Sequence, residues 1–506
     1  MKKGKVYLIG AGPGDPGLIT VRGARCLQVS DVIIYDHLVS EEILLYHTKD
    51  AVRLIYAGKE GEKHTLSQEE INQLLVKEAG RGQVVARLKG GDPFIFGRGG
   101  EEAHALARAG IPFEVIPGVT SAISVPAYAG IPLTHRGYTS SVAFVTGQQD
   151  PTRDETSDWE TLSRIGTLVF LMGVKNLPHI VTNLIKHGKD AATPTALIRW
   201  GTTADQETLI CPLGDMVEKA EERRFSPPAV LVVGHVVALR EDLNWFEKRP
   251  LFGKGIVITR PPAQAHEFAA LLREQGARVI PFPVIRIVPP EDLYSLDHAI
   301  EGLEKYQWII FTSVNGVDFF FARLREQKRD IRDLKGIRIC AIGPATGARI
   351  EKLGIRVDLV PEVFVSEGIV EAFAKLDIRG QRFLLPRAEK ARDVIPQGLS
   401  KLGASVEVVT TYRTVNSGKR KAELEDLINQ GKVDVVTFTS PSTVINFMEI
   451  MGGNKLSVRI KIACIGPVTA AAVKGAGLPV DIMEEQYTIS GLVKAMVRYF
   501  VAAQVV

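Results

Sequence analysis

A glycine-rich segment near the start of the chain is the first candidate for chemistry. Gly10-Ala11-Gly12-Pro13-Gly14-Asp15 follows the apolar run Val6–Ile9, and an acidic residue, Asp31 or Asp36, comes about 20 residues later. This order is typical of a turn that binds the pyrophosphate of a dinucleotide. Asp15, however, stands where such a turn needs a small residue, and its carboxylate would repel a phosphate. An NAD-dependent dehydrogenase is therefore kept only as an alternative.

The elements that must position this segment alternate between strand-like and helical patterns along the whole chain. This alternation predicts α/β layers with largely parallel sheets. Ser67 and Glu70 form a capping box that opens one of the helices. The strand-like runs include Val6–Ile9, Val32–Tyr35, Val84–Leu88, Val142–Thr146, Leu168–Met172 and Val230–Val233, and the helical stretches include Ser67–Ala79 and Glu101–Ala109.

Length and composition restrict the class of protein. A chain of 506 residues should hold three or four domains. Its hydrophobic share of 45% and charged share of 24% are those of a globular protein, and a net charge of +4 excludes a general polyanion-binding surface. An acidic ligand must therefore meet a local cluster of Arg or Lys.

The cysteines and the chain start indicate the compartment. Cys26, Cys211, Cys340 and Cys464 are far apart and form no CxxC pair, which favours buried thiols in a reducing cytosol over zinc or disulfides. No metal site is expected. The apolar run that follows the first lysines is too short for a signal peptide, and no apolar stretch approaches the roughly 18 residues of a membrane span. We expect a cytoplasmic protein.

The second half of the chain repeats itself. The segment 246–254 breaks the strand and helix pattern and is predicted to be a linker, after which a new strand begins at Gly255–Thr259. Several pairs of short motifs then recur at a spacing of 127 and later of 123 positions. A constant offset that changes once is what a duplicated unit with a short deletion produces. The pairs include Phe311-Thr312-Ser313 with Phe438-Thr439-Ser440, and Ala341-Ile342-Gly343-Pro344 with Cys464-Ile465-Gly466-Pro467.

Residues 1–245 carry five ordered motifs that closely resemble uroporphyrinogen-III C-methyltransferase. The resemblance implies two α/β lobes, about 1–115 and 116–245, with S-adenosylmethionine between them, and a homodimer. The motifs are Val6–Pro16, Leu88–Glu102 (with Gly-Asp-Pro-Phe-Ile-Phe-Gly-Arg inside it), Pro117–Ser121, Ile131–Arg136 and Leu168–Gly173.

The resemblance also implies which residues line the cofactor. A sulfonium cofactor carries no phosphate, so a Pro and an Asp in glycine loops are acceptable there. Gly90 and Gly91 leave backbone amides and carbonyls open, Asp92 offers an acceptor, and Met172 offers polarizable sulfur to the adenine. The implied cofactor-binding residues are Pro13, Gly90, Gly91, Asp92, Ile95, Thr120, Ser121, Met172 and Gly201.

The chemistry of methyl transfer requires a proton to leave the substrate as the ring system rearranges. By resemblance, Asp36 is the proton acceptor, Lys59 the proton donor, and Arg98 a bidentate partner of a substrate carboxylate. His135 and Arg136 are implied to contact the substrate. A helix-capping Asp, a solvated Lys and a surface Arg are the structural alternatives for the first three.

Residues 255–506 resemble uroporphyrinogen-III synthase. The architecture that this implies is permuted: one domain of about 255–285 plus 415–506 and another of about 286–412, joined by two crossing strands. The motifs are Ile258–Pro261, Phe311–Val317, Ile342–Thr346, Tyr412–Thr414, Phe438–Ser442 and Ile465–Thr469.

The implied synthase chemistry needs no cofactor. Its linear substrate, hydroxymethylbilane, carries eight carboxylates, so the cleft should present hydroxyls, amides and cations. Tyr412 is implied as the general acid that assists loss of the hydroxyl. Pairs of hydroxyl residues that follow a strand and stand at the start of a helix favour the binding of anions. The same residues also serve as helix caps. The implied substrate-binding residues are Arg260, Thr312, Ser313, Arg387, Thr439 and Ser440.

Together the two resemblances predict a bifunctional tetrapyrrole enzyme. The second half would convert hydroxymethylbilane to uroporphyrinogen III with inversion of ring D, and the first would methylate that product at C2 and C7 to precorrin-2, which leads to sirohaem or cobalamin. The alternative from another class is a methyltransferase with a non-catalytic, tetrapyrrole-binding regulatory module as its second half. No nucleic-acid or membrane partner is expected.

Overall fold

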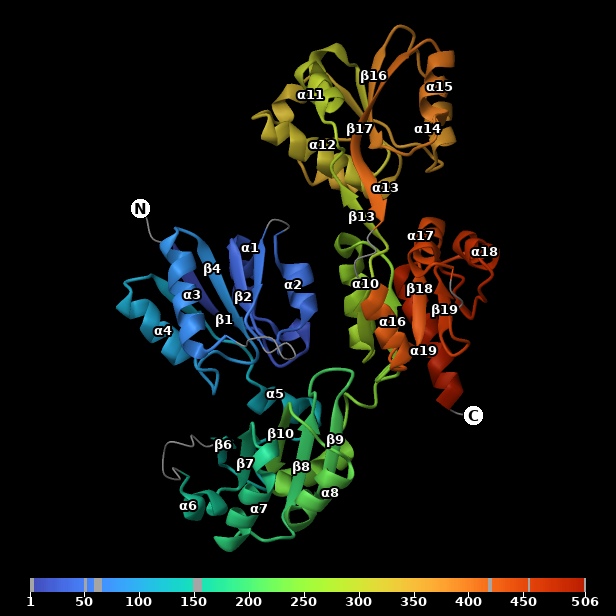
Figure 1. The fold of residues 1–506 in the computed structure, drawn as a ribbon. Helices are drawn as coiled ribbons and strands as arrows, with labels where there is room; N and C mark the ends of the chain where they lie inside the picture. Colours follow the sequence, from blue (N-terminus) through green and yellow to red (C-terminus); the bar gives the residue numbers. More distant parts are fainter. Residues whose placement is uncertain are drawn as a thin grey trace.

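The computed structural model describes residues 4–49, 52–58, 66–148, 157–416, 421–453 and 456–504. Four five-stranded sheets, each covered by helices, succeed one another along the molecule (Figure 1). Two sheets are formed by the first half of the chain and two by the second. The predicted α/β class, with a two-lobed first half and a duplicated second half, is confirmed.

The first sheet is parallel throughout, so the carboxyl ends of its strands lie along one edge. The loops that follow β1, β2, β4 and β5 therefore gather there, and they carry the glycine segment, Asp36, Gly90-Gly91 and Gly118. The strands in spatial order are β3 (Arg53–Tyr56), β2 (Val32–Tyr35), β4 (Val84–Lys89), β1 (Lys5–Gly10) and β5 (Phe113–Ile116). The helices are α1 (Val21–Val29), α2 (Glu41–His47), α3 (Gln68–Gly80) and α4 (Gly99–Arg108).

The second sheet is mixed. Strand β7 lies parallel to β6, whereas β10 is antiparallel to both of its neighbours and β8 is antiparallel to β9. The strands in spatial order are β6 (Val142–Thr146), β7 (Thr167–Leu171), β10 (Ala229–Val233), β8 (Pro194–Arg199) and β9 (Glu207–Pro212). The helices are α5 (Ser121–Tyr128), α6 (Trp159–Arg164), α7 (Leu177–Lys186), α8 (Met216–Glu222) and the short α9 (Arg240–Leu243).

The third sheet is parallel and combines segments from the two ends of the second half. The strands in spatial order are β12 (Arg278–Pro281), β11 (Gly255–Ile258), β18 (Val435–Phe438), β19 (Lys461–Cys464) and β20 (Ile482–Met483). The helices are α10 (Pro262–Glu274), α16 (Lys421–Asn429), α17 (Pro441–Met451), α18 (Pro467–Gly475) and α19 (Ile489–Gln504).

The fourth sheet holds the middle of the second half. Strand β13 pairs antiparallel with the long β17, and these two strands run toward the third sheet (Figure 1). The strands in spatial order are β13 (Ile285–Val288), β17 (Ser405–Asn416), β16 (Arg382–Ala388), β14 (Trp308–Phe311) and β15 (Arg338–Ala341). The helices are α11 (Tyr294–Glu301), α12 (Val314–Glu326), α13 (Pro344–Glu351), α14 (Ser366–Ala374) and α15 (Val394–Lys401).

The internal repeat is distributed across these two sheets. The first copy supplies β11 and β12 to the third sheet and β14 and β15 to the fourth, while the second copy supplies β18 and β19 to the third and β16 and β17 to the fourth. Each sheet therefore contains half of each copy. Buried clusters on both faces of each sheet unite the copies: Ile256 and Ile258 pack with Val435 and Ala463 on one face of the third sheet.

The two halves of the chain contact each other through charged side chains. Arg273 of α10 pairs with Glu42 of α2, and Arg278 of β12 pairs with Asp205. Burial raises the pKa of Glu42, and the pairing with Arg273 opposes that shift. Within the described ranges, no helix is long and apolar enough to cross a membrane.

Candidate active sites

Three glycine loops meet at the carboxyl edge of the first sheet. A Cβ on Gly10 would lie 2.5 Å from the Cα of Gly118 and 2.6 Å from the carbonyl oxygen of Gly91. Gly91, with φ of +66°, donates to the carbonyl of Gly12 over 2.7 Å. Only bare backbone fits in this contact, so the loops leave amides and carbonyls, rather than side chains, around a ligand at this edge.

Asp92 ties two of these loops together. Its Oδ1 accepts from the backbone N–H of Phe94 over 2.8 Å, and its Oδ2 accepts from the N–H of Gly118 over 2.9 Å. Each oxygen already has a protein partner and offers a ligand only its second lone pair. Gly90 packs closely as well, because a Cβ there would lie 2.6 Å from that of Leu38.

Asp15 links the two lobes of the first half. Its N–H donates to the Thr202 hydroxyl over 3.1 Å, and its carboxylate accepts from the Tyr128 hydroxyl over 2.8 Å and from the N–H of Gly17. Burial and the neighbouring carboxylate raise the pKa of Tyr128. Asp15, whose carboxylate argues against a dinucleotide-binding loop, thus joins the two lobes of the first half.

The remaining predicted cofactor residues lie at ends of strands and helices. Thr120 caps α5 by accepting from Ala122, and Ser121 is the first residue of that helix. Met172 follows β7 with φ of +57° and is exposed, as is Ile95. Gly201 packs against Val125, which leaves no room for a Cβ. Pro13 is half-buried in the loop after β1.

These features fit S-adenosylmethionine. The glycine loops bring bare backbone together at this edge of the sheet. A sulfonium with an ammonium and a carboxylate needs amide donors, carbonyl acceptors and apolar contacts rather than a phosphate site.

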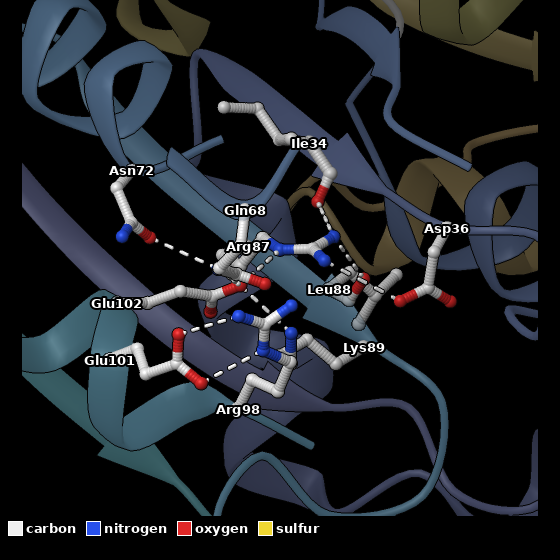
Figure 2. A network of polar contacts seen from close by, with 10 residues as sticks. All are labelled: Ile34, Asp36, Gln68, Asn72, Arg87, Leu88, Lys89, Arg98, Glu101 and Glu102. Atoms are coloured by element: carbon white, nitrogen blue, oxygen red, sulfur yellow. Dashed lines mark hydrogen bonds and ion pairs between the residues drawn. The ribbon is translucent and has the colours of Figure 1, made fainter. Parts of the chain in front are cut away.

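Asp36 stands directly after β2 and beside a buried charged network (Figure 2). Its Oδ1 accepts from the N–H of Leu38 over 3.3 Å, and its Oδ2 lies 3.5 Å from Nη2 of Arg87. Arg87 and Lys89 both contact Glu102, at 3.1 and 2.8 Å. Asp36 therefore closes its own turn, and its second oxygen faces a guanidinium; the N-cap residue of α2 is Ser40 rather than Asp36.

Arg98 forms a bidentate ion pair within its own helix. Its Nε and Nη2 donate to the two carboxylate oxygens of Glu101 over 2.8 and 2.7 Å, and the pairing raises the pKa of Arg98. The side chain is 58% exposed, and its backbone is left-handed, with φ of +57°. The Glu101 carboxylate holds the guanidinium at the surface. A substrate carboxylate would have to bind beside Glu101 or replace it.

The other predicted residues of the first half are not joined to this network by any described contact. His135 and Arg136 are exposed in a turn closed by backbone bonds between His135 and Thr139. Lys59 lies outside the described residues.

A cavity of about 240 Å³ lies between the two sheets of the second half. Four of the predicted residues line it, and they come from both domains, because β17 carries Tyr412 out of the fourth sheet toward the third. The lining residues are Arg260, Pro261, Gln264, Ile287, Asn315, Tyr412, Thr439, Ser440 and Thr443.

Tyr412 is fixed at this cavity. It is 8% exposed, its hydroxyl lies 3.0 Å from that of Ser313, and its ring stacks on Phe319. Ser313 also accepts from the N–H of Gly316, as the cap of α12. Ser440 caps α17 in the same way. Ser440 is therefore both a helix cap and a cavity-lining group, whereas Ser313 is a helix cap that contacts the cavity residue Tyr412.

The cations of the second half are not equivalent. Arg260 lines the cavity, where burial lowers its pKa, and it donates to Gln264 over 3.3 Å. Arg387, its repeat equivalent, instead pairs with Asp393 at 2.7 Å. Thr312 is half-buried beside Ser313. Arg413, the neighbour of Tyr412 in the sequence, pairs with Glu291.

Several site residues escaped the sequence analysis. Arg87, Lys89 and Glu102 lie in or beside the motif Leu88–Glu102, but their pairing depends on α4 packing against β4. Gln264 and Thr443 line the cavity from the first turns of helices that follow motif residues, and Asn315, which lies inside the motif Phe311–Val317, lines it from the first turn of α12. A helical spacing of three or four residues from Arg260 and Ser440 was the available signal.

Comparisons with known proteins assign a family to each half of the chain. The model of the family "Tetrapyrrole (Corrin/Porphyrin) Methylases" matches residues 5–217, and that of "Uroporphyrinogen-III synthase HemD" matches residues 266–494. The chain is 37% identical over 494 residues to the "Porphyrin biosynthesis protein HemD" of Ruminiclostridium josui, covering 97% of each protein.

Two further relatives match one or both halves. The "Uroporphyrinogen-III C-methyltransferase" of Bacillus subtilis (strain 168) is 40% identical over 484 residues, covering 94% of each chain. A crystal structure of uroporphyrin-III C-methyltransferase from Thermus thermophilus, complexed with S-adenyl homocysteine, is 39% identical and covers 47% of this chain and all of its own, with a TM-score of 0.41. The chain belongs to the family of tetrapyrrole-biosynthesis proteins in which a tetrapyrrole methylase is followed by a uroporphyrinogen-III synthase.

Proposed function

We propose that this chain catalyses two consecutive steps of tetrapyrrole synthesis. Its second half closes hydroxymethylbilane to uroporphyrinogen III with inversion of ring D, and its first half methylates that product at C2 and C7 to give precorrin-2. The observation that carries the proposal is the presence of both family domains in one chain that aligns with a relative over 97% of its length.

In the first half, the glycine loops and Met172 would hold S-adenosylmethionine, which supplies the methyl group as an electrophile. Asp36 would accept the proton released from the substrate. Arg98 would exchange its contact with Glu101 for one with a substrate carboxylate. These assignments are supported by the meeting of the three glycine loops at Gly10, Gly91 and Gly118 and by the position of Asp36 beside Arg87.

In the second half, the cavity would bind the linear substrate. Tyr412 would donate its proton to the departing hydroxyl, and Ser313 would orient the phenol. Arg260 and the amide-rich starts of α12 and α17 would contact carboxylates. The convergence of Tyr412, Arg260 and Ser440 on one cavity supports this assignment over a regulatory module without catalysis.

The test separates the two activities in one protein. The full chain with Asp36→Asn should lose methylation of preformed uroporphyrinogen III while it still closes hydroxymethylbilane. Tyr412→Phe should show the reverse pattern. If wild-type protein never closes the bilane but binds it and alters methylation, the regulatory alternative is correct.

The assembly is proposed to be a cytoplasmic homodimer formed through the first half. Apolar side chains are exposed there, on the loop after β4 (Phe94 and Phe96) and on the edge strand β6 (Val142 and Phe144). Four free cysteines agree with a reducing compartment. Light scattering on the full chain and on a Phe94→Ser/Phe96→Ser variant tests the dimer, which should weaken if the loop takes part.

A further inference from the structure

Two buried cations in the first half share one buried carboxylate. Arg87 and Lys89 stand on the same face of β4, and Glu102 of α4 lies against both; their exposed fractions are 3%, 5% and 0%. Oε1 of Glu102 accepts from both cations and from Gln68, whereas its Oε2 has no hydrogen-bond partner among the described residues. This cluster alone holds one excess positive charge, and an uncompensated buried charge is strongly destabilising.

The second anion is Asp36. Nη1 of Arg87 donates to the carbonyls of Ile34 and Leu88 over 3.4 and 3.3 Å, and Nε donates to Glu102. The guanidinium is thus held on two sides, and its remaining nitrogen, Nη2, faces Oδ2 of Asp36 at 3.5 Å (Figure 2).

The other charged groups around Asp36 do not compete for this role. Burial and the neighbouring Arg87 lower the pKa of Lys89, whereas Glu102 and Asp36 raise it. Arg98 and Glu101 neutralise each other. An ionised Asp36 therefore leaves the whole cluster without net charge.

We propose that Arg87 is a positioning residue for methyl transfer, anchored by Glu102 and two strand carbonyls so that it keeps the Asp36 carboxylate directed at the end of β2. The inference rests on the proposed role of Asp36 as proton acceptor. Arg87 itself exchanges no proton, because a guanidinium stays protonated in proteins. The proton from the substrate goes to Asp36 and from there to solvent.

The experiment compares four variants of the full chain: Arg87→Met, Arg87→Lys, Asp36→Asn and the double variant Asp36→Asn/Arg87→Met. Arg108→Met, on the exposed side of α4, is the matched control. The readouts are kcat and KM for methylation of uroporphyrinogen III, the affinity for S-adenosylhomocysteine, and Tm. Arg87→Met should lower kcat by about 100-fold, the low end of what a proton-transfer group contributes, with KM and cofactor affinity nearly unchanged. Arg87→Lys should recover at least part of that loss.

The double variant separates positioning from folding. In the Asp36→Asn background, Arg87→Met should cause no further loss of kcat, and the double variant should melt no lower than either single variant, because Lys89 and Glu102 then balance each other. A wild-type kcat for Arg87→Met, or an equal loss in both backgrounds, would overturn the role of Arg87. A wild-type kcat for Asp36→Asn would instead overturn the proton acceptor, and this inference with it.

Discussion

At the scale of single residues, Tyr412 is the proposed general acid of ring closure. Tyr412→Phe removes only the oxygen that bonds Ser313, so ring closure should slow by roughly 10²–10⁴-fold while stability changes little. Formation of uroporphyrinogen III from hydroxymethylbilane, with isomers separated, measures this. Methylation of preformed uroporphyrinogen III is the internal control, and Ser313→Ala should give a smaller loss because the phenol remains. A Phe variant that closes and inverts the ring at the wild-type rate would leave Tyr412 a packing residue against Phe319.

Arg98, which pairs with Glu101 at the surface, is the proposed partner of a substrate carboxylate in methyl transfer. Arg98→Ala should cost about 2–4 kcal/mol of transition-state binding in methyl transfer, because a bidentate partner of a substrate carboxylate is lost. Affinity for S-adenosylhomocysteine should stay the same, as calorimetry can show. Glu101→Gln is the matched control, since it removes the resident carboxylate and keeps the guanidinium. Equal losses of cofactor affinity and transfer would place Arg98 at the cofactor instead.

The sequence allowed individual motif residues to be predicted, but not their pairings. Asp36 was recognisable as an acidic residue that ends a strand, and Tyr412 as a polar residue whose repeat equivalent is Ile285. The contact of Arg87 with Glu102 was not predictable, because it depends on which face of α4 packs against β4. The ion pair between Arg413 and Glu291 was not predictable either, because it joins two residues that are 122 positions apart in the sequence.

At the scale of elements, the pair α11 and α12 shows how charge contributes to packing. Asp297 of α11 accepts from Nε and Nη2 of Arg323 on α12, each over 2.6 Å, and this pairing lowers the pKa of Asp297. Asp297→Asn should lower the free energy of unfolding by up to about 1 kcal/mol at neutral pH, the upper range for exposed pairs.

The pH dependence of this pair has a defined sign. A carboxyl whose pKa is lowered on folding stabilises the native state above its unfolded value of about 3.9 and loses that contribution as the pH falls through the folded value. The difference in Tm between wild type and Asp297→Asn should therefore shrink below about pH 4. A constant difference from pH 7 to pH 3 would show that the ion pair is not its source.

Regular elements were predicted well, but the full length of a strand that crosses between domains was not. The capping box of Ser67 and Glu70 is present, and strands such as Val32–Tyr35 begin and end where their apolar runs do. The run Val406–Val409 is only part of β17, which continues to Asn416. Its second portion pairs with β13, a partner remote in sequence, so tertiary pairing extends the strand beyond its local pattern.

At the scale of the whole molecule, the junction between the halves is packed. Phe246 is buried against Tyr128, and Glu247 accepts from Gln206 and pairs with Arg240, all in the first half. Leu251, in contrast, is buried with the core of the second half. Residues 246–254, predicted as a linker, therefore contribute side chains to both halves.

This arrangement predicts where the chain can be divided. A fragment 1–248 should be more stable and bind S-adenosylhomocysteine more tightly than a fragment 1–245, because the shorter one exposes the site of Phe246 and leaves Arg240 without Glu247. Thermal melting of both fragments, with and without ligand, measures the difference. Identical melting curves would mean that the packing of 246–247 contributes nothing. The fragment 249–506 should close hydroxymethylbilane by itself.

The internal repeat could not show how its two copies are divided between the domains. Offsets of 127 and 123 positions establish two copies, but they are the same whether each copy forms its own domain or the copies exchange strands. The family resemblance, rather than the repeat, favoured exchange, and the sheets contain half of each copy.

The central claim is that one chain performs both reactions at separate sites. Purified full-length protein supplied anaerobically with hydroxymethylbilane and S-adenosylmethionine tests it most directly, with the products identified by mass and isomer type. The account predicts a dimethylated type III product, unmethylated uroporphyrinogen III when S-adenosylmethionine is omitted, and the same intermediate accumulating with Asp36→Asn. Methylated products of type I alone, the isomer expected from uncatalysed closure, would contradict it, because the second half would then contribute no synthase activity.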